Sequence, residues 1–386
     1  MTTATTTRTP RARKAGKPEG QWKIDGTEPL NQDEVIKQED PGLAARQRVI
    51  DIYSKQGFDS IPAEDLAPRF KWLGLYTQRN QNLGGELTSQ LSNAELQDKY
   101  FMLRVRFDGG RVTPEQLKAV GEISRDYARS TADFTDRQNI QLHWIQIEDV
   151  PAIWDKLEAV GLSTLIGCGD VPRVMLGSPV AGVAKDEIID GTPAIDYIKE
   201  HYLLSDEVQN LPRKFKTAVS GNARQYVTHE IQDIAFVGRE HPEYGKGFDC
   251  FAGGGLSTNP MLARSLGVFV PLERVPEVWL GVVGIFRDYG YRRLRNRARL
   301  KFLVAEWGPR SSSMCARASS ANSRSCARSP CSRTWATAIT SACTSSRTAN
   351  STWALSPRSV TRRASSSSRS RRPRSVLVSA ASARLR

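Results

Sequence analysis

Cys168-Gly-Asp-Val-Pro-Arg173 and Leu211-Pro-Arg-Lys-Phe-Lys216 lie near the two ends of the segment Ile166–Gly221. In the second motif two lysines flank Phe215, so an extended chain places both amines on one face. Phe101-Met-Leu-Arg-Val-Arg106 repeats this alternation with two arginines. Arginine makes fork-like contacts with oxyanions, and lysine acts as a mobile point charge. We therefore expect a wall of cations that faces an anionic ligand.

The net charge of +14 comes from the C-terminal part of the chain. Residues 309–386 contain 15 arginines and 23 serines but no lysine or acidic residue, which leaves 40 basic and 41 acidic residues before them. A nucleic-acid-binding role through this tail would give steep salt dependence. Because the remainder is neutral, nucleic acid is not the expected partner.

The change of composition after Gly308 has two interpretations. One is a natural, disordered Ser/Arg-rich tail. The other, which the absence of Lys, Asp and Glu favours, is out-of-frame translation. Resequencing the codons around Trp307–Arg310 would distinguish them.

Cysteine usage and hydropathy indicate the compartment. Only Cys168 and Cys250 precede residue 309, which is typical of a reducing environment rather than a disulfide scaffold. Residues 1–17 lack the apolar centre of a secretory signal, and no apolar run is long enough for a membrane span. We expect a cytoplasmic protein without a membrane partner.

Local patterns predict the first part of an α+β fold. They indicate a helix over 43–55, a strand over 100–107, a helix beginning at the capping box Thr113–Gln116, strands near 133–138 and 140–147, a helix over 150–159 and a strand over 174–176. This order, β-α-β-β-α-β, is ferredoxin-like. The mixture of aromatics and cations at 69–79 is by itself typical of a surface loop.

The second part reads as mixed α/β. We expect strands over 215–219 and 231–237, a Gly-rich loop at 253–255 followed by a helix, a helix over 275–289 and a strand over 297–304. The Gly-rich loop lacks the Lys-Ser/Thr of a P-loop, so we expect no nucleotide site. The predicted organisation is a disordered arm (1–40), a helical and loop lead-in (41–95), a ferredoxin-like half-domain (96–165), an α/β domain (166–308) and the tail (309–386).

Several side chains also have ordinary interpretations. Arg104 and Arg106 could be solvated on a half-exposed sheet. Cys168 could be a plain thiol, because no second cysteine lies at metal-ligand spacing within its segment. His143 could be a structural strand histidine.

Six segments together resemble the siroheme-dependent nitrite and sulfite reductases, most closely the ferredoxin-dependent actinobacterial sulfite reductases. They are Lys71–Arg79, Phe101–Arg106, Thr135–His143, Cys168–Arg173, Leu211–Lys216 and Gly253–Pro260. The resemblance covers residues 40–308. It implies a siroheme-binding domain at 166–308, ferredoxin as electron donor, and sulfite or, alternatively, nitrite as substrate.

The resemblance also implies residue roles. Arg104, Arg173, Lys214 and Lys216 would hold the substrate and relay protons. Arg106, Arg137, Gln141 and His143 would line the siroheme pocket. Tyr76 and Cys168 would lie beside the active site, where some members carry a thioether. The four cysteines that bind the family's [4Fe–4S] cluster have no counterpart here, so we expect no metal ligands in this chain and an inactive N-terminal half.

Overall fold

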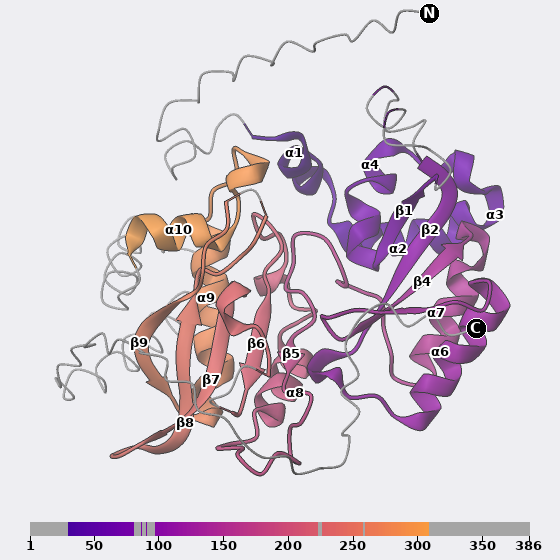
Figure 1. Cartoon of the computed structure of the whole chain (residues 1–386). Coiled ribbons are helices and arrows are strands. Elements are labelled where there is room, and N and C mark those ends of the chain that lie inside the picture. The colour runs from indigo at the N-terminus through magenta and orange to yellow at the C-terminus, as the bar shows by residue number, and fades with distance from the viewer. Residues whose placement is uncertain are drawn as a thin grey trace, which may run out of the picture.

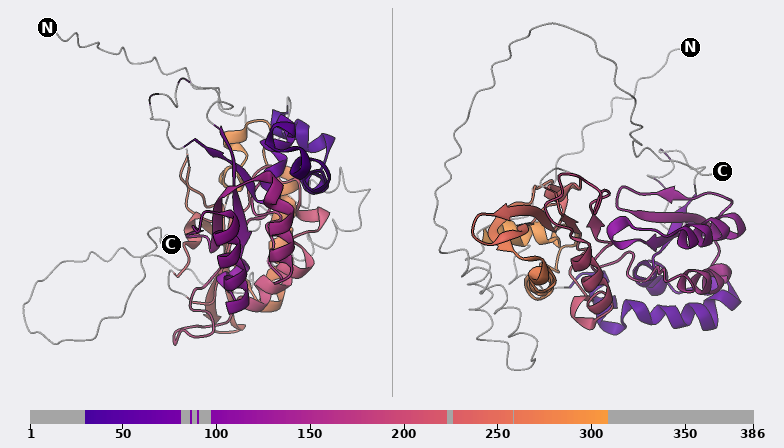
Figure 2. Two further views of the ribbon diagram at one scale, coloured as in Figure 1. Left: turned by 90° about the vertical axis from the view of Figure 1, so that its right-hand side faces the viewer. Right: turned by 90° about the horizontal axis from the view of Figure 1, so that it is seen from below.

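Two β-sheets, each with its own apolar core, organise the chain (Figure 1). The computed structural model describes residues 30–308 apart from 81–85, 87–89, 91–96, 223–225 and 258. The expectations for the arm before residue 30 and for the tail from residue 309, with its four cysteines, concern residues outside these ranges. The two sheets lie side by side in Figure 1 and in the right view of Figure 2, with the earlier part of the chain forming one lobe.

The first sheet is antiparallel, in the order β1-β2-β4-β3. Its strands are β1 (Leu75–Arg79), β2 (Gln97–Arg106), β3 (Asp133–Phe134) and β4 (Asn139–Ile145). The predicted alternation in β2 is confirmed: Phe101, Leu103 and Val105 are buried in the core. The opposite face of the sheet is left for polar side chains.

Helices cover the apolar face of this sheet (Figure 1). They are α2 (Ala45–Arg48), α3 (Ser54–Gln56), α4 (Ala63–Leu66), α6 (Pro114–Tyr127) and α7 (Val150–Glu158). A π-helical turn at Val49–Tyr53 joins α2 to α3. The helix predicted over 43–55 is therefore confirmed as one continuous helical segment. The helix predicted over 150–159 is confirmed as α7.

The capping box at the start of α6 is confirmed. Thr113 Oγ1 accepts from the Gln116 amide at 3.2 Å, and Gln116 Oε1 accepts from the Thr113 amide at 3.0 Å. Two otherwise unsatisfied amides are thereby paired at the helix N-terminus.

Replacing Thr113 with Ala should lower the free energy of unfolding by about 1 kcal/mol, because the cap hydroxyl is lost. Thermal or urea unfolding of the full chain measures this change. Thr113→Ser keeps the hydroxyl and should stay close to the wild type. A Ser variant as unstable as the Ala variant would contradict the capping role.

The second sheet is mixed, in the order β5-β6-β7-β8-β9. Its strands are β5 (Leu176–Gly177), β6 (Thr217–Ser220), β7 (Ile234–His241), β8 (Gly245–Ala252) and β9 (Arg264–Val270). β5, β6 and β7 are parallel, and β7, β8 and β9 are antiparallel. The strands predicted over 215–219 and 231–237 correspond to β6 and β7, displaced by two or three residues.

Three helices belong to this second unit: α8 (Thr192–His201), α9 (Val275–Tyr289) and α10 (Leu300–Trp307). The predicted bounds of α9 are confirmed. Trp279 of this helix is fully buried, and its Nε1 donates to Thr217 Oγ1 of β6 at 2.8 Å. This bond anchors α9 to the strand that follows the Leu211–Lys216 motif.

The strand predicted over 174–176 belongs to the other sheet. Leu176–Gly177 pairs in parallel with β6 and makes no ladder with β2 or β4. The fourth strand of the first sheet is β1 instead, from the segment interpreted as a surface loop. Phe70, Trp72 and Leu75 are buried there, so that interpretation was wrong. A strand of two residues carries too little pattern to assign it to a sheet.

The helix predicted after the Gly-rich loop and the strand predicted over 297–304 are also wrong. The chain leaves Gly253–Gly255 directly for β9, and 300–307 is helix α10. A Cβ on Gly254 would lie 2.3 Å from the Glu230 carbonyl oxygen, so close packing requires this glycine. The alternation at 297–301 came from cations that are buried: Arg299 and Lys301 are 9% and 3% exposed.

Part of the arm expected to be disordered is ordered. Residues Gln32–Glu39 form α1, which begins at Asn31, whose side-chain oxygen accepts from the Glu34 amide at 3.2 Å. In Figure 1 this helix lies at the top, between the two lobes. None of the helices in the described ranges is long and apolar enough to cross a membrane.

Candidate anion-binding site

The polar face of the first sheet supplies one side of the site. Arg104 lies directly opposite Gln141, and Tyr76 lies opposite Met102. Paired residues share a face, so these side chains point away from the core that Leu103 and Leu142 fill. Arg104, Gln141 and Tyr76 therefore lie on the face of the sheet that is opposite to the core.

The two basic motifs supply the other side, and they run next to each other. Leu211 N donates to the Asp170 carbonyl at 2.9 Å, Phe215 N to the Val171 carbonyl at 3.1 Å, and Arg173 N to the Phe215 carbonyl at 2.7 Å. Phe215 is fully buried. Lys214 and Lys216, on either side of it, therefore face away from the core together.

The site's cations lie within one another's electrostatic field. Burial, followed by the charges of Arg173 and Lys216, lowers the pKa of Lys214 to about 8. Burial, followed by the charges of Arg137 and Arg299, lowers the pKa of Lys216 to about 8. We name Arg104, Arg137, Arg173, Lys214 and Lys216 the cationic wall.

Tyr76, Cys168 and Arg173 form a contact group at the wall. Burial, with Cys168 as the next cause, raises the pKa of Tyr76 to about 12. Burial alone would lower the pKa of Arg173, but Cys168 and Tyr76 raise it above its usual value. The structure thus brings the phenol and the thiol together, as the resemblance implies.

Arg137 joins the wall from the turn between β3 and β4. Its guanidinium donates to Gln232 Oε1 at 2.7 Å and to the Val174 carbonyl at 2.8 Å. Burial, followed by the charge of Arg173, lowers its pKa to about 10. Arg137 therefore links the first sheet to the second while it contributes charge to the wall.

His143 lies next to an irregularity in β4. The register between β2 and β4 shifts between Phe101 and Leu103, and Trp144 has a φ of 67°. His143 Nε2 is 3.2 Å from a carboxylate oxygen of Asp133. The predicted contact of His143 with siroheme stays a prediction.

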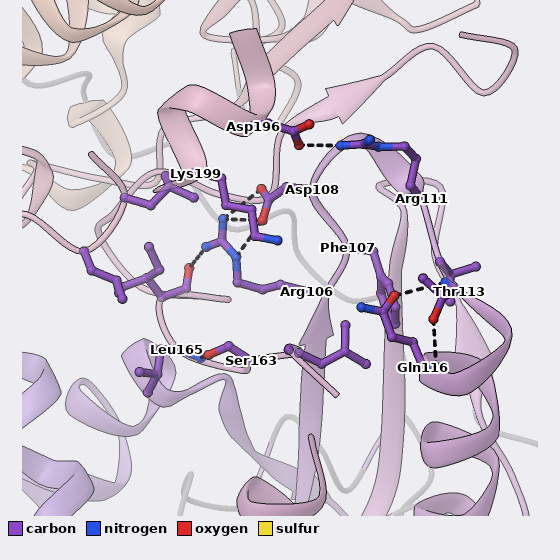
Figure 3. A pocket seen from close by; sticks show the side chains of 16 residues that line it. Arg106, Phe107, Asp108, Arg111, Thr113, Gln116, Ser163, Leu165, Asp196 and Lys199 are labelled. Carbon is purple, nitrogen blue, oxygen red and sulfur yellow. Dashed lines mark hydrogen bonds and ion pairs between the residues drawn. The ribbon is translucent and has the colours of Figure 1, made fainter. Parts of the chain in front are cut away.

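Arg106 points elsewhere. Its guanidinium donates to the Ile166 carbonyl at 2.8 Å and to Asp108 Oδ1 at 2.9 Å. These partners lie at a separate cavity (Figure 3), so the structure does not bring Arg106 to the wall. Alternation with a period of two residues predicts the face of the strand from which a side chain leaves. It does not predict where the charged end of a long side chain lies.

The wall retains unused hydrogen-bonding capacity. Arg104 Nε is buried without a hydrogen-bond partner among the described residues. An unpaired buried donor is costly, and an anionic acceptor would satisfy it. This orphaned donor, together with the depressed lysine pKa values, fits a bound polyanion.

Three charged residues in or beside the basic motifs were not predicted as part of the site: Lys71, Arg213 and Asp233. Lys71 and Arg213 are half-buried cations, and burial is the largest cause that lowers the pKa of each. Asp233 is fully buried and accepts from Arg299 Nη2 at 2.8 Å and from the Lys216 amide at 2.8 Å. Lys71 and Arg213 occur inside motifs quoted above, so their sequence signal was available.

Asp170 holds the two basic motifs in place through ion pairs. It is buried, and its carboxylate accepts from Arg295 Nη2 at 2.8 Å and from Lys37 Nζ at 3.2 Å. Lys37 lies on α1 and also donates to the Leu211 carbonyl at 3.0 Å. We call this group of Lys37, Asp170 and Arg295 the α1 clamp.

The metal-ligating residues do not gather. In the ranges that the structure describes, no group of three or more His, Cys, Asp or Glu side chains could hold a metal ion. Cys168 and Cys250 are both free and buried. The arrangement therefore offers a positively charged, partly buried surface for an anion.

Two family models match the chain. Residues 168–313 match the "Nitrite and sulphite reductase 4Fe-4S domain", and residues 94–160 match the "Nitrite/Sulfite reductase ferredoxin-like half domain". The fold is α+β, and the wall gathers several cations on one partly buried surface. The chain belongs to the nitrite and sulfite reductase family.

Curated relatives agree with this assignment. The chain is 56% identical over 290 residues to "Sulfite reductase [ferredoxin] 1" of Mycolicibacterium paratuberculosis, covering 75% of this chain and 52% of the relative. It is 54% identical over 290 residues to "Sulfite reductase [ferredoxin]" of Mycobacterium tuberculosis H37Rv, with the same coverage. It is 35% identical to the "Assimilatory ferredoxin-dependent nitrite reductase" of Haloferax mediterranei, covering 67% and 45%.

A solved structure supports the same fold. The Mycobacterium tuberculosis NirA protein superposes with a TM-score of 0.71 at 53% identity, covering 76% of this chain and 53% of that chain. The chain thus spans about half the length of the relatives that it matches.

Proposed function

We propose that this chain forms the substrate-facing and siroheme-facing part of a ferredoxin-dependent sulfite reductase. The observation that carries the proposal is the cationic wall, which two motifs and two strands build around the unpaired Arg104 Nε. The 54–56% identity to ferredoxin-dependent sulfite reductases supports sulfite over nitrite, for which the related reductase is 35% identical.

Siroheme fits the residues present. Its many carboxylates match a wall of five cations, and the charge of Arg213 also acts on Lys214 of this wall. When bound, siroheme would supply the iron that accepts electrons and passes them to the substrate. Arg137, Gln141 and His143 would face it. For the [4Fe–4S] cluster in the matched domain's description, the described residues offer two separate buried cysteines and no cluster of ligands.

The wall's residues divide the work between binding and protonation. Arg104 and Arg173 would hold the oxygens of the substrate by charge-assisted hydrogen bonds. Lys214 and Lys216, with pKa values of about 8, can release a proton near neutral pH and recover it from water. A bound anion favours the protonated amines, so substrate binding would load both proton donors.

Binding of uroporphyrin, a porphyrin with as many carboxylates as siroheme, tests the wall. Its fluorescence anisotropy should report saturable binding to the full chain. Lys216→Met and Arg104→Met should each weaken binding at least about tenfold, because each removes a charged hydrogen bond worth roughly 1.5–3 kcal/mol.

Lys118→Met is the matched control for this titration, because Lys118 is exposed on α6 and away from the wall. The Arg-rich segment 309–386 contributes the same background to all four proteins. Equal affinities for the wall variants and the control would refute the proposed polycarboxylate site.

We further propose that Tyr76 and Cys168 can be joined by a thioether in a two-electron oxidation by dioxygen. The S–H bond of Cys168 and one ring C–H bond of Tyr76 break, a C–S bond forms, and dioxygen takes up the two electrons and two protons as hydrogen peroxide. The direct interaction of the two side chains at the wall supports this link. Intact-mass spectrometry would then find a species lighter by two hydrogen atoms, and peptide mapping would recover the two residues in one cross-linked peptide. Tyr76→Phe should remove this species. A denatured chain whose Cys168 is fully alkylated would exclude the link in the isolated protein.

Substrate choice needs a full-length enzyme. Joining the second half of the M. tuberculosis relative after Gly308 would allow kcat/KM to be compared for sulfite and nitrite, with ferredoxin as donor. We expect sulfite to be preferred, and a preference for nitrite would establish the alternative. We propose that the full protein acts in the cytoplasm, where soluble ferredoxin is available.

A further inference from the structure

A second cavity lies where the first sheet's unit meets α8, apart from the cationic wall (Figure 3). Its volume is 420 Å³. Small-molecule pockets range over about 300–1,000 Å³, so this cavity is large enough for a small ligand. It is bounded by the start of α6, the segment 161–166 and the end of α8.

Most of the cavity's lining is apolar. The apolar side chains that line it are Phe107, Val112, Leu162, Leu165, Ile166, Leu203 and Leu204. Val112 and Leu204 are 44% and 59% exposed and lie in the same cavity, so they form part of one exposed apolar surface. An apolar ligand would cover this surface.

The charged side chains of the cavity leave one cation unpaired. The buried Arg106 is paired with Asp108 at 2.9 Å, and Arg111 is paired with Asp196. Lys199 has no hydrogen bond or ion pair within the described part of the chain, and Figure 3 shows its side chain running toward the Arg106–Asp108 pair.

The cavity therefore has an excess of one positive charge. The positive end of the α6 dipole adds to it, because Thr113 and Gln116 at the helix N-terminus belong to the lining. The carboxylates of Asp108 and Asp196 would repel a second negative charge on a ligand. Charge and lining together select a ligand with one anionic group.

We propose that this cavity binds a small amphipathic monoanion, with its apolar body against the leucines and its carboxylate at Lys199. The site goes beyond the proposed reductase function and uses none of the wall's residues. A buried ion pair at the floor and a solvated lysine at the edge are the usual arrangement of such pockets, with few polar groups fixing an apolar ligand.

Decanoate is the probe, and decanol is its uncharged counterpart. Isothermal titration of the full chain should give saturable decanoate binding that Lys199→Glu weakens at least tenfold. Decanol binding should change by less than twofold. Lys118→Glu makes the same charge change outside the cavity and should leave both ligands unaffected. The Arg-rich segment 309–386 contributes equally in every protein, so it cannot produce a difference between these variants.

A second pair of variants keeps the test independent of Lys199. Leu204→Glu places a carboxylate at the cavity, whereas Leu204→Gln has nearly the same shape without the charge. The Glu variant should bind decanoate several-fold more weakly than the Gln variant, with equal decanol binding. Equal decanoate affinities within both matched pairs, or no saturable binding, would overturn the proposal.

Discussion

Replacing Asp233 with Ala is expected to lower the free energy of unfolding by about 3–5 kcal/mol. The carboxylate is fully buried and accepts from Arg299 Nε at 3.1 Å and Nη2 at 2.8 Å. Its removal would leave the guanidinium of Arg299 buried and uncompensated. A loss of this size is a large fraction of the typical 5–15 kcal/mol stability of a domain. Urea unfolding of the full chain measures it.

The matched control is Asp249→Ala. Asp249 pairs with Arg239 at 3.0 Å, but both side chains are partly exposed, so we expect a change below about 1 kcal/mol. Replacing Asp233 with Leu and Arg299 with Met together should recover part of the loss, because no buried charge then remains. Similar losses for the Asp233 and Asp249 variants would show that the buried pair is not the cause.

Lys214 and Lys216 are expected to react with a small amine-directed reagent about two orders of magnitude faster at pH 8 than ordinary lysines do. With pKa values of about 8, about half of each amine is neutral at that pH. An amine with the usual pKa near 10.4 is neutral in less than about 1% of molecules. Competitive labelling read by mass spectrometry, with exposed Lys118 as the internal reference, measures the ratio.

The dependence of the labelling rate on pH, and its change when an anion is added, test the direction of the two pKa shifts. Reactivity should rise as the pH increases through about 8, because the charged form is the one that burial and neighbouring cations disfavour. Sulfate bound at the wall should raise both pKa values and slow labelling at pH 8. Labelling that rises only near pH 10 would contradict the proposed electrostatics.

Local sequence patterns predicted those helices and strands that neighbouring residues in the sequence determine. Strand β2 alternates, α6 has its capping box, and α9 has an apolar face, so each could be identified from nearby residues. Helix α10 was misread because Arg299 and Lys301 imitate the polar face of a strand. Their partners, Asp233 and the carbonyl of Asn259, lie 66 and 42 residues away.

The same distinction holds for the candidate site. The motifs and the family resemblance predicted Arg104, Arg173, Lys214 and Lys216, and the structure brings these residues together. Asp233 was missed because nothing near it in the sequence identifies its partners. Arg106 was assigned by alternation alone, and the ion pair with Asp108 directs it to another cavity. Ion pairs between residues far apart in the sequence leave no periodic pattern from which they could be predicted.

The α1 clamp sets the boundary of the cooperative folding unit. Both matched family regions exclude Lys37, since the earlier one begins at residue 94. A shortened chain that starts there would lose strand β1, with Leu75 from the first core, and would leave Asp170 with Arg295 but without Lys37. A unit that keeps both β1 and the α1 clamp therefore begins no later than Asn31, upstream of residue 94, where the earlier of the two family models begins.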